Sequence, residues 1–188
     1  MNRRTFFSLT AIALASSLAA CNTAKTPTEA ASKRQEIDTS VDASINKLYS
    51  STLGSREQGS KAKAILVFPS VIAAGLVVGG EYGEGALREG GKSVGYYKTS
   101  TASLGLQIGA QSKAVIMMFM TQEALDKFRA SKGWTAGADG SVAVAKTGAN
   151  GALDTATTNA PIVGFVLTNS GLMANLSFEG TKVSKLEI

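Results

Sequence analysis

The segment from residue 75 to residue 109 reads GLVVGGEYGEGALREGGKSVGYYKTSTASLGLQIG, and its composition decides the fold. It holds ten of the twenty glycines of the chain in 35 residues, interleaved with Val, Leu, Tyr and Ile. A flexible linker lacks such apolar residues, whereas glycine inside strand-like sequence is typical of bulges, sharp bends and close approach of two backbones. The segment therefore predicts several short, strongly curved antiparallel strands.

The sequence before and after this segment adds helices and further strands. Apolar residues three or four apart predict an amphipathic helix over residues 37–53, and a second short helix is expected over 56–64. Residues 65–68 form a β-rich run that Pro69 is expected to end. The most apolar run after the signal region, residues 115–120, predicts a central strand.

Beyond that strand, Thr121 fits the N-cap of a helix over residues 121–132. Three later segments have strand-like patterns: residues 141–145, 162–167 and 172–178. Strands and helices do not alternate as βαβ units, so a parallel doubly wound sheet is not expected. The prediction is a single α+β domain over residues 29–188, with a curved, glycine-rich antiparallel sheet, an N-terminal amphipathic helix and a second helix near 121–132.

The first twenty residues have the composition of an export signal. Arg3 and Arg4 precede an uncharged run, rich in Ala and Leu, that is shorter than the roughly 20 apolar residues of a membrane span. The only cysteine, Cys21, follows Leu18-Ala19-Ala20, and this stretch resembles the lipobox of bacterial lipoproteins. In that family the cysteine becomes the first mature residue and carries acyl chains such as palmitate. We therefore expect a removed lipoprotein signal peptide over residues 1–20 and lipidation of Cys21.

Lipidation at Cys21 has consequences for location. Two or more acyl chains hold a protein stably at a membrane, and the small polar residues 21–28 would form the tether. Asn22 stands where an Asp commonly retains lipoproteins at the inner membrane, so we expect the outer membrane, facing the periplasm of a double-membrane bacterium. Arg3-Arg4 also resembles a twin-arginine signal, but general secretion with two chance arginines fits as well.

Composition excludes several classes of function. The 188 residues include no His and one Cys, which rules out intrachain disulfides, Cys/His zinc sites and His-dependent catalysis. Two of the 19 basic residues lie in the signal region, so 17 oppose 14 acidic residues and the mature net charge is +3. No block of five or six like charges occurs, so nucleic acid is not an expected partner. We also expect no metal and no other cofactor.

The glycine-rich segment contains two carboxylates that invite a catalytic interpretation. Glu81 and Glu84 repel phosphate, and their glycines lack the spacing of a dinucleotide-binding loop. A glycosidase-like acid and base pair would need both side chains on one face, whereas strand residues three apart point to opposite faces. No catalytic residue is therefore predicted, and the chain is expected not to be an enzyme.

The run from Val78 to Gly85 and the later run from Ala102 to Gln111 together resemble the SYLF domain family of lipid-binding modules. The residues that carry this resemblance are Gly79, Gly80, Tyr82, Gly83, Gly85, Gly105, Gln107 and Gly109. The resemblance spans roughly residues 47–188 and implies a non-enzymatic domain. Eukaryotic members bind phosphoinositide-containing membranes and some regulate actin. For an exported chain, what transfers is affinity for anionic lipid head groups.

The same resemblance implies that membrane contact is made by the N-terminal helix and by basic surface residues. The candidates here are Lys61, Lys63, Arg88, Lys92 and Lys98. Two hypotheses follow. Either the anchored domain binds lipid head groups, or Cys21 alone supplies the membrane contact and the glycine-rich sheet, with Tyr82 and Gln107, docks a protein partner in the envelope.

Overall fold

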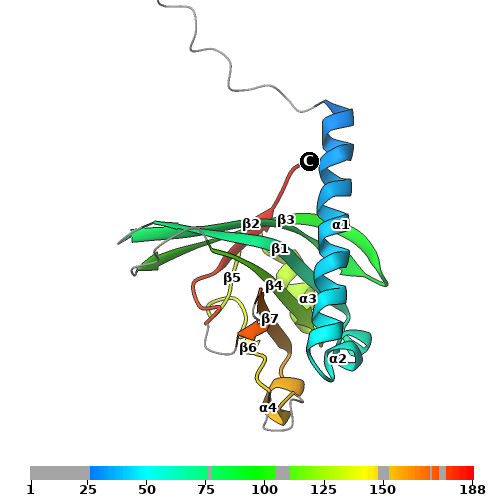
Figure 1. The fold of residues 1–188 in the computed structure, drawn as a ribbon, viewed down its shortest axis with the longest axis vertical. Coiled ribbons are helices and arrows are strands. Elements are labelled where there is room, and N and C mark those ends of the chain that lie inside the picture. The colour runs from blue at the N-terminus through cyan, green and yellow to red at the C-terminus, as the bar shows by residue number, and fades with distance from the viewer. Residues whose placement is uncertain (1–25, 76–77, 105–110, 148–152, 170, 174–176) are drawn as a thin grey trace, which may run out of the picture.

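The structure is a computed structural model that describes residues 26–75, 78–104, 111–147, 153–169, 171–173 and 177–188. Its elements are α1 (Pro27–Ser51), α2 (Ser55–Lys61), β1 (Ala64–Gly75), β2 (Val78–Glu89), β3 (Lys92–Leu104), β4 (Gln111–Phe119), α3 (Gln122–Ala130), β5 (Trp134–Thr135), β6 (Ala143–Val144), α4 (Thr155–Thr158), β7 (Ile162–Thr168), β8 (Gly171–Met173) and β9 (Lys182–Lys185) (Figure 1). Within these ranges, no helix combines the length and the apolar character that a membrane crossing requires.

The strands form one strongly curled sheet with the order β5-β9-β3-β2-β1-β4-β7-β6, and β8 pairs with β7. The predicted α+β fold, with a curved sheet and an N-terminal helix, is thus confirmed. The sheet is not purely antiparallel as predicted, because β6 runs parallel to β7. Parallel neighbours need a long crossover, and the connection that contains α4 supplies it.

The glycine-rich segment forms two long strands, so the prediction of several short ones is wrong. β2 has 12 residues, β3 has 13, and they pair from Val78↔Leu104 to Glu89↔Lys92. Gly90 and Gly91 join them with φ angles of 53° and 82°. Two successive positive φ angles fit a type I′ hairpin turn, whose twist matches that of the flanking strands.

Pro69 does not end the strand that begins before it, contrary to the prediction. β1 continues to Gly75 and pairs with β2 and β4 on its two sides. The register against β2 shifts between Val67 and Ser70, so Pro69 lies in a bulge. A bulge leaves a residue out of the hydrogen-bond ladder, which is why a residue without an N–H is accepted in an interior strand.

The bulge explains two glycines of β2. A Cβ on Gly85 would overlap the carbonyl oxygen of Val67, and a Cβ on Gly83 would lie 2.9 Å from the carbonyl oxygen of Ser70. The predicted close approach of two backbones is therefore confirmed at these two positions. Three residues of the family resemblance fall outside the described residues: Gly105, Gln107 and Gly109.

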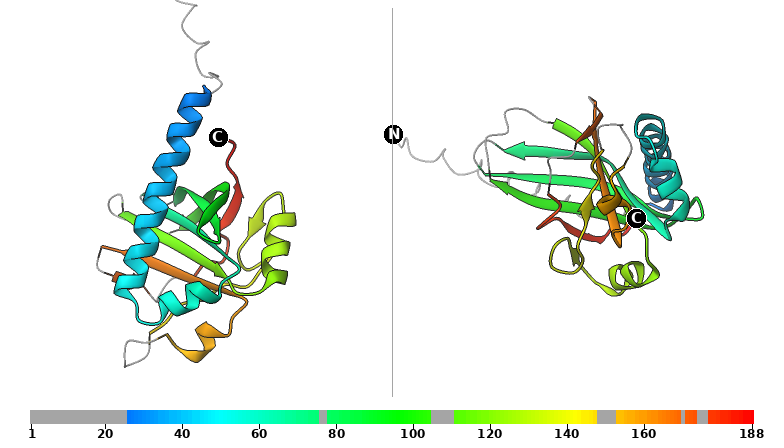
Figure 2. Two further views of the ribbon diagram at one scale, coloured as in Figure 1. Left: turned by 90° about the vertical axis from the view of Figure 1, so that its right-hand side faces the viewer. Right: turned by 90° about the horizontal axis from the view of Figure 1, so that it is seen from below.

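The sheet buries a hydrophobic cluster on each face. Met117 of β4 packs in the cluster that includes Leu125 of α3, whereas its neighbour Ile116 packs in the cluster that includes Val41 of α1. Side chains of a strand alternate between faces, so α1 and α3 cover opposite sides of the sheet (Figure 2). The helix predicted over 121–132 is α3, and the Thr121 hydroxyl caps it by accepting from the Ala124 N–H.

Helix α1 begins at Pro27, ten residues before its predicted start. The Thr26 hydroxyl accepts from the Glu29 N–H while the Glu29 carboxylate accepts from the Thr26 N–H, which is a capping box. The last two residues of the predicted tether, 27–28, are therefore helical. Only the later turns are held by buried residues, the first of which is Ile37, and the earlier turns project beyond the sheet (Figure 1).

The C-terminal part departs most from prediction. The strand expected over 172–178 is described only as β8, and the strand expected over 141–145 shrinks to β6. Two-residue and four-residue elements such as β5, β9 and α4 were not predicted, because they are too short to show a periodicity.

Candidate functional site

The five basic residues predicted to bind lipid do not share one surface. Lys63 and Arg88 line one cavity, Lys61 ends α2, and Lys92 begins β3 beside the hairpin turn that also borders this cavity. Lys98 lies six residues beyond Lys92 on β3, about 20 Å away at the spacing of a strand. The structure therefore gathers four of the five toward one end of α1 and separates Lys98.

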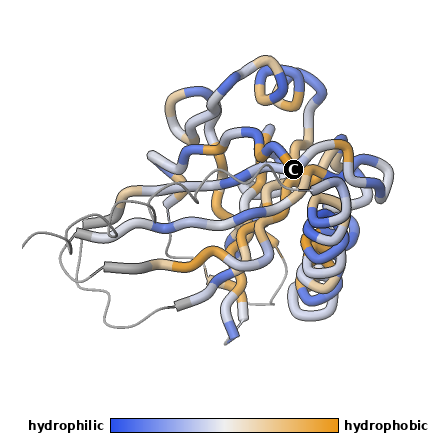
Figure 3. The backbone as a smooth tube through the Cα atoms, turned by 90° about the horizontal axis from the view of Figure 1, so that it is seen from above, coloured by the Kyte–Doolittle hydropathy of each residue, from blue (hydrophilic) through white to orange (hydrophobic). Residues whose placement is uncertain are grey.

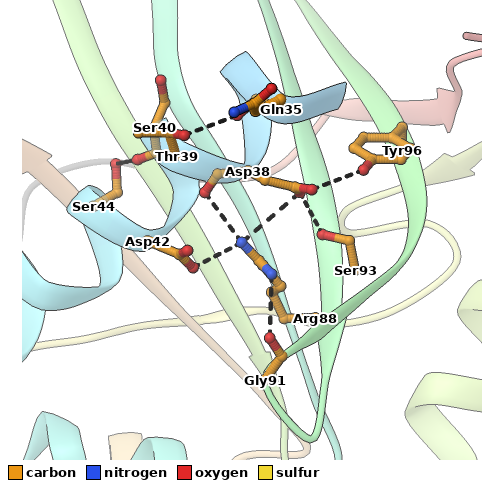
Figure 4. A network of polar contacts seen from close by, with 10 residues as sticks. All are labelled: Gln35, Asp38, Thr39, Ser40, Asp42, Ser44, Arg88, Gly91, Ser93 and Tyr96. Carbon is orange, nitrogen blue, oxygen red and sulfur yellow. Dashed lines mark hydrogen bonds and ion pairs between the residues drawn. The ribbon is translucent and has the colours of Figure 1, made fainter. Parts of the chain in front are cut away.

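Arg88 is part of a polar network that fastens α1 to the sheet (Figure 4). Its Nη2 donates to Asp42 Oδ1 at 2.7 Å and to the Asp38 carbonyl oxygen at 3.0 Å, and its Nη1 donates to the Gly91 carbonyl oxygen at 3.1 Å. The Arg88 side chain is only 10% exposed. Its buried Nε lacks a hydrogen-bond partner in the part of the chain that the structure describes.

Asp38 holds the other half of this network. Its carboxylate accepts from the Ser93 hydroxyl at 2.6 Å and from the Tyr96 hydroxyl at 3.0 Å. Asp38 and Asp42 are four residues apart on a helix, so both reach toward β2 and β3. Arg88 is consequently a structural cation between α1 and the sheet rather than an exposed one.

The apolar stripe of α1 faces the sheet. Ile37, Val41 and Leu48 are buried there. The outward side carries small and polar exposed residues, among them Gln35, Thr39, Asn46 and Ser50. Membrane contact through the apolar stripe would therefore require α1 to leave the sheet.

A cavity of about 400 Å³ opens between α1, α2 and the β2–β3 hairpin, and we call it the hairpin pocket. The polar residues that line it include Asp42, Tyr49, Ser60, Lys63 and Arg88, and Gly91 contributes backbone. Lys63 is exposed and forms no ion pair with any described residue, whereas Lys61 pairs with Glu57 at 2.6 Å. Lys63 is thus the available ammonium of the pocket.

Tyr49 forms a wall of the hairpin pocket. Its ring lies over Gly59, where a Cβ would overlap the phenol, and Arg56 Cζ lies 4.8 Å from the ring centroid in a cation–π contact. Sequence reasoning missed Tyr49 and Asp42 as site residues. The spacing of Asp38 and Asp42 on one predicted helix face was a signal for the second of them.

The two carboxylates of the glycine-rich segment are held by different elements. Lys113 Nζ of β4 donates to Glu81 at 2.8 Å, and Lys33 of α1 lies 3.1 Å from Glu84. Glu84, which pairs with Lys33 of α1, lies on the face of the sheet that α1 covers. Along β4, Lys113 alternates with Ala114 and Ile116, which pack toward α1, so Lys113 and its partner Glu81 lie on the opposite face. The expectation that Glu81 and Glu84 diverge to opposite faces is confirmed.

A second cavity, of about 560 Å³, lies between the middle of α1 and strands β1 and β2, and we call it the α1 groove. Ile72 and Tyr82 pair across these strands in its lining and are 50% and 49% exposed. The Tyr82 hydroxyl donates to Glu84 Oε1 at 2.9 Å. The long strands extend past α1, which leaves part of the sheet without a helical cover (Figure 3).

All four tyrosines of the chain have raised pKa values. Burial disfavours the phenolate in Tyr49, Tyr82, Tyr96 and Tyr97, and in Tyr96 the hydrogen bond to Asp38 and the charge of that carboxylate add to the shift.

None of the described residues form a cluster of three or more potential metal-ligating His, Cys, Asp or Glu side chains.

These tyrosines predict that alkali destabilises the fold. Because folding raises the pKa of each tyrosine, the neutral phenols contribute to the stability of the fold. This contribution is complete below the pKa of an unfolded tyrosine, about 10, and is lost as pH rises through the pKa values of the folded protein. We expect the urea midpoint to fall between about pH 9 and pH 11, and to fall less in Tyr96→Phe. A midpoint that falls equally in both proteins would contradict the role of Tyr96.

Residues 100–187 match the model of the family described as Ysc84, Las17-binding protein actin regulator. This family is the SYLF family named above. The match runs from β3 to the residue before the C-terminus and confirms the resemblance, although residues 79–85 precede it. A comparison with curated proteins found no match to the chain.

Proposed function

We propose, on the premise that the chain carries a SYLF-family domain matched over residues 100–187, that it is a membrane-anchored bacterial lipoprotein whose folded domain binds lipid head groups without catalysing a reaction. The head groups are those of anionic phospholipids or phosphoinositide-like lipids. Acylated Cys21 holds the domain at the outer membrane, facing the periplasm. The observation that carries this proposal is the hairpin pocket. There Lys63, which forms no ion pair with a described residue, and Arg88 both line a cavity of head-group size.

The tether limits how the domain meets its membrane. Thr26 lies five positions after Cys21, and an extended chain of that length spans at most about 18 Å. Asp42, at the hairpin pocket, lies sixteen residues further along, about 24 Å at the rise of an α-helix. Charges act over about 8 Å at physiological salt. The pocket therefore reaches the anchoring bilayer when α1 lies along the membrane, and not when α1 stands upright on it.

Sedimentation with lipid vesicles tests this function. The protein is the chain from residue 21 onward with Cys21→Ser, which retains every described element because α1 begins at Pro27. We expect more protein to pellet with vesicles of phosphatidylcholine and phosphatidylglycerol than with phosphatidylcholine alone, and the difference to shrink as salt is added. Equal pelleting with both vesicles at low salt would contradict head-group binding.

A pair of variants locates the binding. A lysine near an anionic surface contributes about 1 kcal/mol, so Lys63→Gln is expected to weaken vesicle binding about fivefold. Lys98→Gln removes the same charge from an exposed position about 20 Å from Lys92 along β3 and is expected to have a smaller effect. Equal losses in the two variants would indicate binding without the hairpin pocket.

The alternative function is that of an envelope structural or interaction protein that docks a protein partner through its glycine-rich sheet. The exposed pair Ile72 and Tyr82 in the α1 groove favours it, because side chains of this kind commonly form interface anchors. Cross-linking in cells tests it. One stoichiometric protein partner that is lost in Tyr82→Ala or Gln107→Ala would support docking, and its absence would exclude this alternative.

A further inference from the structure

We propose that the hairpin pocket selects a zwitterionic lipid head group, namely a phosphodiester that carries a primary ammonium. Lys63 binds the phosphate and Asp42 binds the ammonium. This inference rests on the proposed binding of lipid head groups and departs from the anionic class named there. The head group seated in the pocket is zwitterionic, and anionic lipids attract the domain through its net positive charge.

Asp42 is the residue that argues against a site for simple anions. Its Oδ1 accepts from Arg88, but its Oδ2 has no hydrogen-bond donor in the described ranges, and its side chain is 62% exposed at the pocket. A carboxylate with a free oxygen repels an approaching phosphate and attracts an ammonium that can donate to it. The pocket therefore offers one position for a cation.

Lys63 supplies the complementary position. It lines the same cavity, and the described residues provide no carboxylate to pair with it. An ammonium donates up to three hydrogen bonds and suits a phosphate oxygen. Arg88 is already engaged by Asp42 and Gly91, so Lys63 is the group free to bind a phosphate.

The remaining walls suit a small polar molecule. The volume of about 400 Å³ lies within the range of small-molecule sites. The Tyr49 hydroxyl makes no hydrogen bond with a described residue. Gly59 has no side chain, and this makes room for the Tyr49 ring at the wall of the pocket. A primary ammonium can donate to Asp42, whereas a quaternary ammonium has no N–H, so the pocket should distinguish the two.

Calorimetry with soluble head groups tests the selection. The Cys21→Ser chain from residue 21 onward is titrated with glycerophosphoethanolamine, glycerophosphocholine and glycerophosphoglycerol, which share the phosphodiester and differ in the amine. We expect the tightest binding for glycerophosphoethanolamine. Equal affinity for all three would overturn the proposal.

Two variants should respond in different ways. Asp42→Asn keeps the Oδ1 acceptor for Arg88 but removes the carboxylate charge, so glycerophosphoethanolamine should bind about tenfold more weakly, the loss typical of one charged hydrogen bond. Glycerophosphoglycerol should bind equally well or more tightly. Lys63→Gln should weaken all three. Thermal unfolding of each variant checks that the fold is retained.

Asp126→Asn is the matched control, because it changes the net charge equally on α3, which covers the other face of the sheet. It should leave the preference unchanged. A loss in Asp42→Asn that is equal for all three head groups would overturn the assignment of the ammonium position. If selection fails while anionic vesicles still bind, this inference falls and the proposed function stands. If neither head groups nor vesicles bind, both fall.

Discussion

Gly85→Ala is expected to destabilise the fold by on the order of 4 kcal/mol, among the largest effects of a single substitution. The new methyl group would occupy the position of the Val67 carbonyl oxygen. That atom is backbone in the bulge of β1, an interior strand, so no side-chain rotation can relieve the overlap. Relief requires β1 and β2 to separate, which disrupts the pairing on which both faces of the sheet depend.

Gly80→Ala in the same strand is the matched control. A Cβ on Gly80 would lie 3.8 Å from the Thr101 carbonyl oxygen, an ordinary contact, so its urea midpoint should stay close to that of the native protein. The difference between the two midpoints measures the close approach at the bulge. Similar midpoints in the two variants would show that the β1–β2 spacing adapts, against this account of the glycine-rich segment.

Cys21→Ser is expected to move nearly all of the protein from the membrane fraction to the soluble fraction of the native host. Each buried methylene of an acyl chain contributes about 0.8 kcal/mol, so loss of the chains removes far more binding energy than any surface lysine supplies. What remains should be weak attachment that salt reverses. Fractionation of cells, followed by a salt wash of the membranes, measures both parts.

The native protein, fractionated in parallel, is the control. It should stay with the membranes through the salt wash. If Cys21→Ser remains in the membrane fraction after high salt, the domain binds by another route and the lipid anchor is dispensable.

Sequence reasoning succeeded where a pattern was long or chemically distinctive. The apolar run over 115–120 predicted interior strand β4, and Thr121 predicted the start of α3. The start of α1 was missed because the turns between Pro27 and Ile37 have only Ala30 and Ala31 as apolar residues and carry no hydrophobic period. Its signal was the capping box of Thr26 and Glu29 rather than any apolar residue.

Pro69 and the dense glycines were the harder cases. Taken alone, Pro69 signals the end of a strand, and glycines signal short or broken ones. In the structure these departures compensate for one another, because the bulge at Pro69 brings the β1 backbone against Gly85. Such compensation depends on residues from two strands, so no local pattern reports it.

The candidate site was only partly predictable. The family resemblance named Lys63 and Arg88 among its candidates. Their charges alone do not say that Arg88 pairs with Asp42 while Lys63 has no ion-pair partner among the described residues. That distinction comes from Asp42, which α1 brings to the β2–β3 hairpin 46 residues away in sequence. A basic residue is therefore a poor guide to a binding site until its carboxylate partners are known.

The most direct test of the account is where the domain contacts lipid. Amide chemical shifts of the isotope-labelled Cys21→Ser chain, recorded by NMR as nanodiscs of phosphatidylethanolamine and phosphatidylglycerol are added, report this residue by residue. The account predicts that the shifts gather at Asp42, Tyr49, Lys63, Gly90 and Gly91, around the hairpin pocket. Shifts confined to the α1 groove at Ile72 and Tyr82, or no shifts at all, would contradict it.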